Sequence, residues 1–339
     1  MRHWIYLLLA FLSLTVSGTV HSEDLGNVYG IELEGFSYPY PVGHFPFVSQ
    51  SQDLQMGYMD VKSKGKSNGH TVVLMHGKNF CGATWETTIA ALEGSGYRVV
   101  VPDQVGFCTS TKPAYYQYSF QQLAYNTRAL LQQLGVSRAI VVGHSTGGML
   151  ATRFALMYPE IVEKLVMVNP IGLEDWKAIG VPGLTIDQWY ERELNLSADR
   201  VRRYEQNVYY VGRWKPEYER WVDMLVGLNR GPGHKLVAWN SALIYDMIYT
   251  QPVVYEFPLL KVPATLMLGD ADITAIGRDI APPEVKAKIG QYKQLGKKVI
   301  KTIPNGRLIE FPGFGHAPQI EAPAMFNKAL LDDLATVNN

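Results

Sequence analysis

The pentapeptide Gly143-His144-Ser145-Thr146-Gly147 constrains the fold of this chain more than any other stretch. Residues 138–142 before it are typical of a short buried strand, and residues 148–158 after it are typical of a helix with a mostly apolar face. Small residues around the serine allow a tight turn between the two elements, and the amino-terminal end of a helix favours nearby negative charge. The pattern therefore predicts a nucleophilic Ser145 held in a strained turn above a sheet.

The rest of the chain alternates short buried strands with helices. Residues 45–61 alternate between apolar and polar side chains, as expected for two antiparallel strands joined by a turn. Further buried strands are predicted at residues 71–75, 98–101, 164–169, 264–268 and 307–311, and helices at residues 120–134 and 147–158. This alternation indicates an α/β fold with a mostly parallel, doubly wound sheet.

One interval breaks the alternation. No buried strand is evident between residues 171 and 257, and tyrosine and tryptophan are dense there. Structureless loops of such length are uncommon in compact domains. We therefore predict that residues 171–257 form a mainly helical insertion, a lid with an apolar inner face. The core would then comprise residues 23–170 and 258–339.

Polar residues that complement a serine nucleophile follow two of the predicted strands. Asp270 and Asp272 come directly after the strand at residues 264–268, and His316 lies in the loop after the strand at residues 307–311. A serine hydroxyl needs a base to accept its proton and an acid to orient that base. The order Ser145, aspartate, His316 along the chain therefore predicts a catalytic triad, with either aspartate as its acid.

Several motifs resemble the lid-containing α/β-hydrolase superfamily, over about residues 45–335. His76-Gly77 follows the third predicted strand, and the stretch from Asp103 to Pro113 is similar to the superfamily pattern D-x-x-G-x-G-x-S-x-x-P. Cys108 departs from that pattern, because it stands where glycine is usual. The resemblance implies an α/β-hydrolase fold with an inserted helical lid.

The same resemblance assigns roles to individual residues. In similar proteins the acid of the triad lies three residues beyond the glycine that ends its strand, which favours Asp272 over Asp270. The resemblance also implies that the backbone N–H groups of Lys78 and Thr146 form an oxyanion hole. Such donors stabilise the negative charge that develops on the substrate oxygen. The expected catalytic residues are thus Ser145, Asp272 and His316.

The amino-terminal segment, residues 1–22, has the features of a secretory signal. Arg2 precedes an apolar run at residues 5–16, and small residues then lead up to Glu23. This run is too short to span a bilayer comfortably, so we predict cleavage and export to the periplasm or the medium. An uncleaved amino-terminal anchor is the alternative. In an exported protein Cys81 and Cys108, the only cysteines, either form a disulfide or remain separate buried thiols.

Charge and motifs exclude several classes of ligand. The chain has 31 Lys and Arg residues and 31 Asp and Glu residues, so its formal net charge is zero. No basic block favours nucleic-acid binding, and no motif typical of metal or phosphate sites is present. We therefore expect no cofactor and no metal. Neutrality suits an uncharged or apolar small-molecule substrate.

The nucleophile separates the chain from some proteins of similar architecture. Epoxide hydrolases and haloalkane dehalogenases that resemble it use aspartate at the position of Ser145. The resemblance therefore implies a serine hydrolase, and hydrolysis of a carboxylic ester through an acyl-enzyme is the leading hypothesis. A carbon–carbon bond hydrolase and a cofactor-free perhydrolase would use the same triad. A non-catalytic ligand receptor that keeps the fold is a further alternative.

Overall fold

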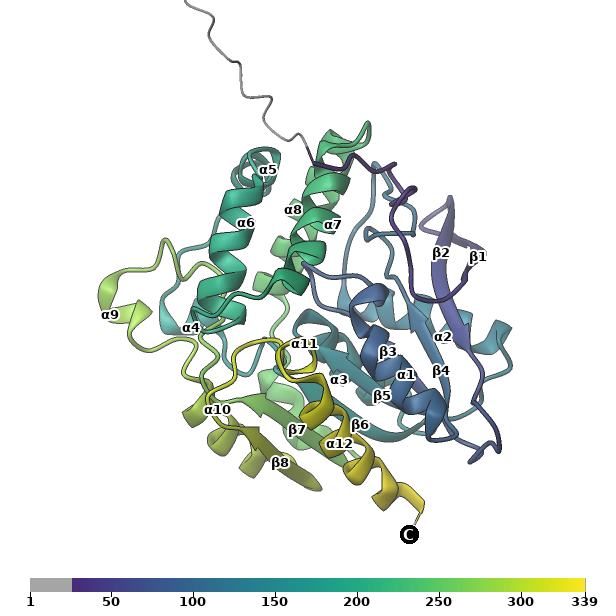
Figure 1. Ribbon diagram of the computed structural model, residues 1–339. Coiled ribbons are helices and arrows are strands. Elements are labelled where there is room, and N and C mark those ends of the chain that lie inside the picture. The colour runs from purple at the N-terminus through teal and green to yellow at the C-terminus, as the bar shows by residue number, and fades with distance from the viewer. Residues whose placement is uncertain (1–25, 339) are drawn as a thin grey trace, which may run out of the picture.

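The computed structural model describes residues 26–338, so the segment interpreted as a signal lies outside the described residues. An eight-stranded sheet forms the centre of the molecule, in the order β1-β2-β4-β3-β5-β6-β7-β8 (Figure 1). The strands are β1 (Val42–Ser49), β2 (Gln52–Val61), β3 (Thr71–Met75), β4 (Arg98–Pro102), β5 (Ala139–His144), β6 (Val162–Val168), β7 (Ala264–Gly269) and β8 (Gly306–Phe311). β2 pairs antiparallel with β1 and β4, and every other pair is parallel. The mostly parallel sheet is thus confirmed, with strand ends within three residues of the predicted positions.

Helices cover both faces of the sheet, because its inner strands are apolar on both sides. In β3, Val72 and Leu74 belong to one hydrophobic core, whereas Val73 and Met75 belong to the other. One core contains side chains of α1 (Glu86–Gly94) and α12 (Pro323–Leu334). The other contains side chains of α2 (Phe120–Gln133), α3 (Thr146–Met157) and α10 (Tyr292–Val299). This arrangement is the layered α/β architecture that the alternation of strands and helices predicted.

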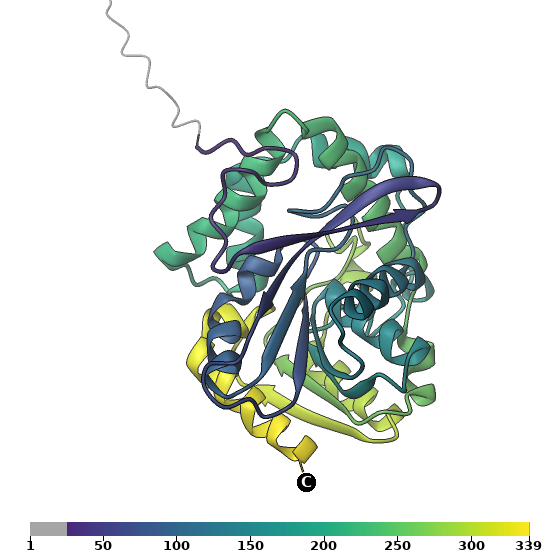
Figure 2. The same cartoon turned by 90° about the vertical axis from the view of Figure 1, so that its right-hand side faces the viewer.

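Between β6 and β7 the chain leaves the sheet and forms helices, which stand together above it (Figures 1 and 2). These helices are α4 (Trp176–Ile179), α5 (Ile186–Leu194), α6 (Ala198–Tyr204), the π-helix η2 (Glu205–Tyr209), η3 (Pro216–Tyr218), α7 (Glu219–Arg230), α8 (His234–Thr250) and η4 (Val254–Leu259). Two of them begin at capping residues: Thr185 forms a capping box with Gln188 at the start of α5, and the Ser197 hydroxyl caps the start of α6. Residues 171–257 are all described and contain no strand.

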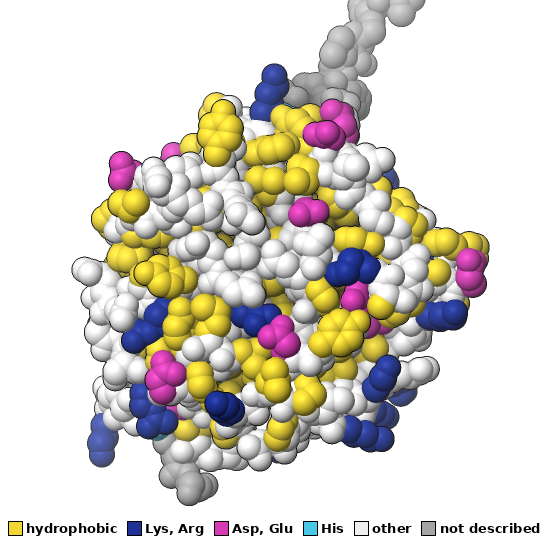
Figure 3. Space-filling view, turned by 180° about the vertical axis from the view of Figure 1, so that it is seen from behind, with side chains coloured by type: hydrophobic (Ala, Val, Ile, Leu, Met, Phe, Trp, Pro, Cys, Tyr) yellow, Lys and Arg dark blue, Asp and Glu magenta, His cyan; other side chains and the backbone are white. Residues whose placement is uncertain are grey.

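Short helices complete the fold and connect the larger elements. They are η1 (Gly82–Trp85), α9 (Pro283–Lys286), η5 (Ile300–Thr302), α11 (Pro318–Glu321) and η6 (Ala335–Asn338). The face seen from behind mixes apolar side chains with charges of both signs (Figure 3). Over residues 26–338, no helix is both long enough and apolar enough to cross a membrane.

Candidate active site

Ser145 occupies the junction between β5 and α3 in a strained backbone conformation, with φ of 57° and ψ of −121°. Positive φ is unfavourable for a residue with a side chain and persists only where the surroundings hold it. Here the Ser145 N–H donates to the Val168 carbonyl at 3.0 Å. A Cβ atom at Gly147 would lie 2.3 Å from the Met75 carbonyl oxygen, so only glycine fits this close approach. The turn after β5 is therefore held by its contacts with the neighbouring strands β3 and β6.

The structure brings Ser145, His316 and Asp272 into one hydrogen-bonded chain. Nε2 of His316 lies 2.9 Å from Oγ of Ser145, and Nδ1 of the same ring lies 2.7 Å from Oδ2 of Asp272. All three residues are buried, and Ser145 keeps 6% of its surface exposed. When a hydroxyl, an imidazole and a carboxylate are hydrogen-bonded in this order, the imidazole can accept the proton of the serine hydroxyl.

Asp272 is held by further hydrogen bonds, whereas Asp270 turns elsewhere. The Asp272 carboxylate also accepts hydrogen bonds from the Asn169 side chain at 2.9 Å and from the Thr274 N–H at 2.8 Å. Asp270 accepts from the Gly313 N–H at 2.7 Å and lies 3.5 Å from the Lys293 ammonium. Of the two aspartates considered from the sequence, the structure therefore places Asp272 against His316. Sequence reasoning missed Asn169, whose only signal was its position directly after β6.

Two further histidines near the site position its loops. Nε2 of His144 donates to the His316 carbonyl at 2.8 Å, which fixes the loop that carries the base. His76 donates from Nδ1 to the Gly77 carbonyl at 2.9 Å and accepts from the Gln104 N–H at 3.1 Å. Burial lowers the pKa of both imidazoles, so both are neutral near pH 7. Their hydrogen bonds are all directed at the backbone, which is a structural role.

The two residues assigned to the oxyanion hole flank the nucleophile. Thr146 follows Ser145 as the first residue of α3. Lys78 follows Gly77, and a Cβ atom at Gly77 would lie 2.9 Å from the Ser145 Cβ, so the loop after β3 passes directly against the nucleophile. The Thr146 hydroxyl is buried and finds no hydrogen-bond partner among residues 26–338. Thr146 and the loop that carries Lys78 thus both lie next to Ser145.

The side chain of Lys78 connects this loop to the helices above it. Its ammonium lies 3.0 Å from the Glu193 carboxylate of α5 and 3.6 Å from the centre of the Tyr245 ring of α8. The Ser241 hydroxyl of α8 donates to the same carboxylate. Burial lowers the pKa of the Lys78 ammonium, while Glu193 opposes this shift. The sequence pointed to Lys78 for its backbone N–H alone, because nothing in the sequence pairs it with Glu193.

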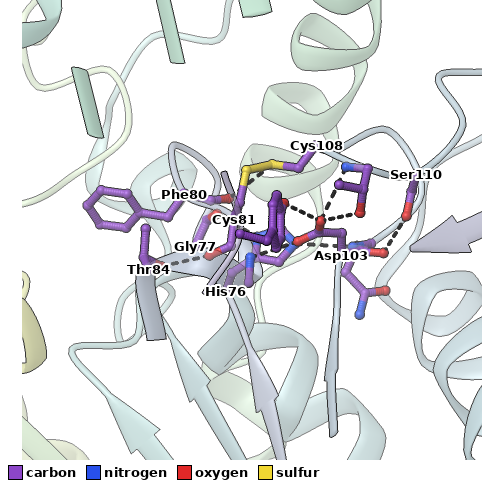
Figure 4. The surroundings of a disulfide bond; sticks show 12 residues. His76, Gly77, Phe80, Cys81, Thr84, Asp103, Cys108 and Ser110 are labelled. Atoms are coloured by element: carbon purple, nitrogen blue, oxygen red, sulfur yellow. Dashed lines mark hydrogen bonds between the residues drawn. A yellow bond between two sulfur atoms is a disulfide. The ribbon is translucent and has the colours of Figure 1, made fainter. Parts of the chain in front are cut away.

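A disulfide between Cys81 and Cys108 joins the loop after β3 to the loop after β4 (Figure 4). Of the two states left open by the sequence, the structure therefore has the bridge. Cys108 has a φ of 42°, a left-handed conformation that explains why the superfamily pattern has glycine there. Nearby, the buried Asp103 accepts hydrogen bonds from the Gly82 N–H at 2.7 Å and the Thr109 hydroxyl at 2.6 Å. The bridge and Asp103 together fix the loop after β3, which contains Lys78.

Tyr209, at the end of the π-helix η2, contacts the base from above. Its ring centre lies 4.8 Å from that of His316, and its backbone carbonyl accepts a hydrogen bond from the backbone N–H of His316 at 3.0 Å. Its hydroxyl accepts a hydrogen bond from the Asn79 side chain at 2.9 Å. π-helical turns are rare and often occur at functional sites. Tyr209 therefore joins the insertion to the base and to the loop after β3.

The eight-stranded sheet, the strained serine turn and the buried histidine–aspartate pair define an α/β hydrolase. Residues 70–209 match the family described as alpha/beta hydrolase fold. The chain is also 60% identical to a probable hydrolytic enzyme of Pseudomonas aeruginosa PAO1, covering 91% of this chain and 98% of that one, with a TM-score of 0.90. The chain belongs to the α/β-hydrolase superfamily, and it is a hydrolytic enzyme of that family.

More distant relatives carry different activities in their names. Lipase 1 of Psychrobacter immobilis is 28% identical over 263 residues, which cover 76% of this chain and 74% of the lipase. The 2-hydroxy-6-oxo-6-phenylhexa-2,4-dienoate hydrolase of Burkholderia cepacia is 25% identical over 303 residues, which cover 84% of this chain and 98% of that enzyme. Membership of the family therefore does not identify the bond that is cleaved, which has to be inferred from the site.

Proposed function

We propose that this protein is a serine hydrolase that cleaves carboxylic esters of apolar substrates through an acyl-enzyme. The observation that carries the proposal is the hydrogen-bonded chain from Ser145 Oγ through the His316 ring to Asp272. A serine with a base and an orienting acid at these distances is equipped for nucleophilic attack on a carbonyl carbon.

In the first half of the reaction, Ser145 Oγ bonds to the ester carbonyl carbon while His316 Nε2 takes the hydroxyl proton. The carbonyl oxygen becomes negative and is stabilised by the N–H groups of Lys78 and Thr146, each worth about 3 kcal/mol of the barrier. Asp272 keeps His316 in the required tautomer and stabilises the imidazolium. The tetrahedral intermediate then collapses, the C–O bond to the alcohol breaks, and His316 returns the proton to the departing alcohol.

In the second half, water takes the place of the alcohol. His316 Nε2 accepts a proton from the water as its oxygen bonds to the acyl carbon. Collapse of this second intermediate breaks the bond to Ser145 Oγ, which regains the proton from His316. The acid is released, and the enzyme returns to its starting state with one ester bond and one water consumed.

A carbon–carbon bond hydrolase is a second candidate, because the Burkholderia cepacia relative aligns over 98% of its own length and is named for a dienoate substrate. The same nucleophile, base and acid would serve. In that case, activity on vinylogous diketones should exceed activity on esters. The lipase relative favours the ester reaction.

We also propose that the protein is exported after removal of residues 1–22. The Cys81–Cys108 disulfide supports this proposal, because disulfides persist mainly in oxidising compartments. The amino-terminal residue of the protein purified from the periplasm or medium would test it. A start at Glu23 is expected, whereas an intact Met1 in the membrane fraction would contradict cleavage.

Hydrolysis of p-nitrophenyl esters from acetate to laurate tests the activity. We expect the wild type to hydrolyse the series and Ser145→Ala to lose at least about 10³-fold in rate. Mass spectrometry with a fluorophosphonate should label Ser145 in the wild type alone. A folded wild type that is neither labelled nor active on any ester would exclude a serine esterase. Tight ligand binding that survives Ser145→Ala would then indicate a receptor.

A further inference from the structure

A cavity of about 380 Å³ opens within the helices above the site. It is enclosed by α5, α6, α7, α8 and the segment that follows β7, and α5, α6 and α8 stand close together in Figure 1. Apolar side chains form most of its wall, among them Trp189, Val201, Leu225, Tyr245 and Ile276. The cavity can therefore bind an apolar chain or ring.

The charged residues at this cavity are unevenly balanced. Its lining includes four basic residues, Arg192, Arg200, Arg278 and Lys286, but only two carboxylates, Glu193 and Asp279. Both carboxylates are already engaged within the protein: Glu193 pairs with Lys78, and Asp279 pairs with Arg192. The cavity therefore has an excess of positive charge.

Two of the four cations are available to a ligand. Arg278 is half-buried and donates to the Ile289 carbonyl at 2.6 Å, and Arg192 is held by Asp279. Arg200 and Lys286 are exposed, and neither forms an ion pair with any residue between 26 and 338; Arg200 donates one long hydrogen bond, at 3.3 Å, to the Arg192 carbonyl. They leave a cationic mouth on an apolar cavity. An arginine and a lysine in this setting are suited to a carboxylate or another small anion.

The inner end of the cavity approaches the nucleophile. Asn79, which lines the cavity, adjoins Lys78 in the loop that passes against Ser145. Its side chain donates to the Tyr209 hydroxyl, and the Tyr209 ring stacks near His316. Tyr204, another lining residue, lies with its ring centre 5.3 Å from that of Tyr209. The Tyr209 ring thus separates the cavity from the base, and an ester in the cavity must pass it to reach Ser145.

We propose that the substrate is an anionic amphiphile: an ester whose apolar acyl part ends in a carboxylate-like group. Arg200 and Lys286 bind the anion at the mouth, the apolar part fills the cavity, and the ester carbonyl extends from the inner end past Tyr209 to Ser145. This inference rests on the proposed esterase function and makes its substrate class more specific. The zero net charge of the chain as a whole conceals this local excess of positive charge.

A pair of esters matched in length tests the proposal. Mono-p-nitrophenyl suberate and p-nitrophenyl octanoate have the same acyl chain length, and only the suberate has a terminal carboxylate. For the wild type we expect kcat/KM to be about 10-fold higher for the suberate ester at low ionic strength. Because the cations are exposed, this preference should fall several-fold in 0.5 M salt.

The double variant Arg200→Gln/Lys286→Gln should reduce the ratio of the two kcat/KM values to about 1. Arg203→Gln is the control. Arg203 lies on α6, as Arg200 does, and is exposed, but it does not line the cavity. It should keep the wild-type ratio. A ratio near or below 1 in the wild type, or a ratio unchanged in the double variant, would overturn the proposal while leaving the esterase function intact.

Equilibrium binding separates failure of this inference from failure of the esterase function. Calorimetry with Ser145→Ala should show monomethyl suberate binding about 10-fold more tightly than methyl octanoate, with the difference lost on adding Arg200→Gln/Lys286→Gln. This result is expected even if turnover is absent. Equal affinity for the two esters would overturn the anion site by itself.

Discussion

The floor and the roof of the site are held by different kinds of interaction. The floor consists of the strand ends and the loops that carry the triad, and here backbone hydrogen bonds and close glycine contacts such as that of Gly147 fix the geometry. The roof is the insertion, residues 171–257, and it meets the floor largely through side chains, with one backbone hydrogen bond from the His316 N–H to the Tyr209 carbonyl. Lys78 with Glu193 and Asn79 with Tyr209 are the principal pairs.

This difference shows how one fold can serve several reactions. The positions of the nucleophile, base and acid are set by the sheet. Its backbone hydrogen bonds do not depend on which apolar side chains the strands carry. Substrate contacts depend on the roof, where aromatic pairs such as Trp189 and Tyr245, with ring centres 4.4 Å apart, can change by substitution without disturbing the sheet. Changes in the floor should therefore abolish the chemistry, whereas changes in the roof should alter stability and choice of substrate.

The largest expected effect comes from Asp272→Asn in the floor. An amide in place of this carboxylate favours the wrong tautomer of His316, so kcat for p-nitrophenyl butyrate should fall about 10³- to 10⁴-fold. Asp270→Asn is the matched control and should stay within about threefold of wild type, because Asp270 bonds to Gly313 and not to the base. Equal losses in the two variants would contradict the assignment of the acid.

Removing the disulfide tests how far the floor relies on covalent closure. Cys81 and Cys108 are separated by 27 positions in the sequence, and a bridge across such a loop stabilises a protein by about 3–4 kcal/mol. Urea unfolding of Cys81→Ala/Cys108→Ala should show this loss. Reductant should destabilise the wild type but leave the double variant unchanged; a wild type insensitive to complete reduction would show that the loops hold without the bridge.

Glu205 provides a pH test of the roof. Both of its carboxylate oxygens are buried without a hydrogen-bond partner in the described part of the chain. Burial, assisted by the charge of Glu219, raises the pKa of Glu205 to about 8. The folded state therefore keeps a proton that the unfolded chain releases near pH 4.5, and stability contributed by the neutral acid declines as pH rises from about 4.5 to 8.

Glu205→Gln should remove that decline. We expect the variant to unfold like the wild type near pH 4.5 and to be about 4–5 kcal/mol more stable near pH 9, because a difference of one in pKa corresponds to about 1.4 kcal/mol. Chemical denaturation across this range measures the difference. Glu217→Gln, at an exposed acid of the same insertion, controls for a general effect of charge and should follow the wild type. Parallel pH profiles for wild type and Glu205→Gln would show that Glu205 is ionised in the folded protein.

The smallest expected effect concerns two adjacent tyrosines of the roof. The Tyr209 hydroxyl accepts a hydrogen bond from Asn79, whereas the Tyr210 hydroxyl is buried without a partner among the described residues. Tyr209→Phe should therefore cost about 1 kcal/mol of unfolding free energy, and Tyr210→Phe should be neutral or slightly stabilising. Thermal unfolding of the two variants measures this difference. A larger loss of stability in Tyr210→Phe than in Tyr209→Phe would indicate that the stabilising hydrogen bond is made by Tyr210.

The sequence predicted the floor far better than the roof. The strands of the sheet, the turn at Ser145, an aspartate after β7 and His316 after β8 all follow from local patterns, since each lies at the end of its own strand. The preference for Asp272 over Asp270 came from the family resemblance. Roof contacts depend on side chains brought together from distant positions. Lys78 and Glu193 are 115 positions apart, and neither has a local signal for the other.

Two features lay between these extremes. The departure at Cys108 was visible in the sequence, but its meaning needed the left-handed φ and the bridge to Cys81. The cavity above the site was suggested by the aromatic composition of residues 171–257. The sequence did not reveal which cations at the cavity lack an ion pair among the described residues. Ion pairing depends on how α5, α6 and the segment after β7 are arranged, whereas composition gives only the total charge.

The pairing of Lys78 with Glu193 limits how freely the two parts can be recombined. An engineer who grafts the insertion of another hydrolase onto this sheet would leave the buried ammonium of Lys78 without its counter-ion, in the loop that passes against the nucleophile. Such a chimera would lose activity even though every triad residue was retained. Transplanted helices must therefore bring an acid to the position of Glu193, or the graft must replace Lys78 with a neutral residue at the same time.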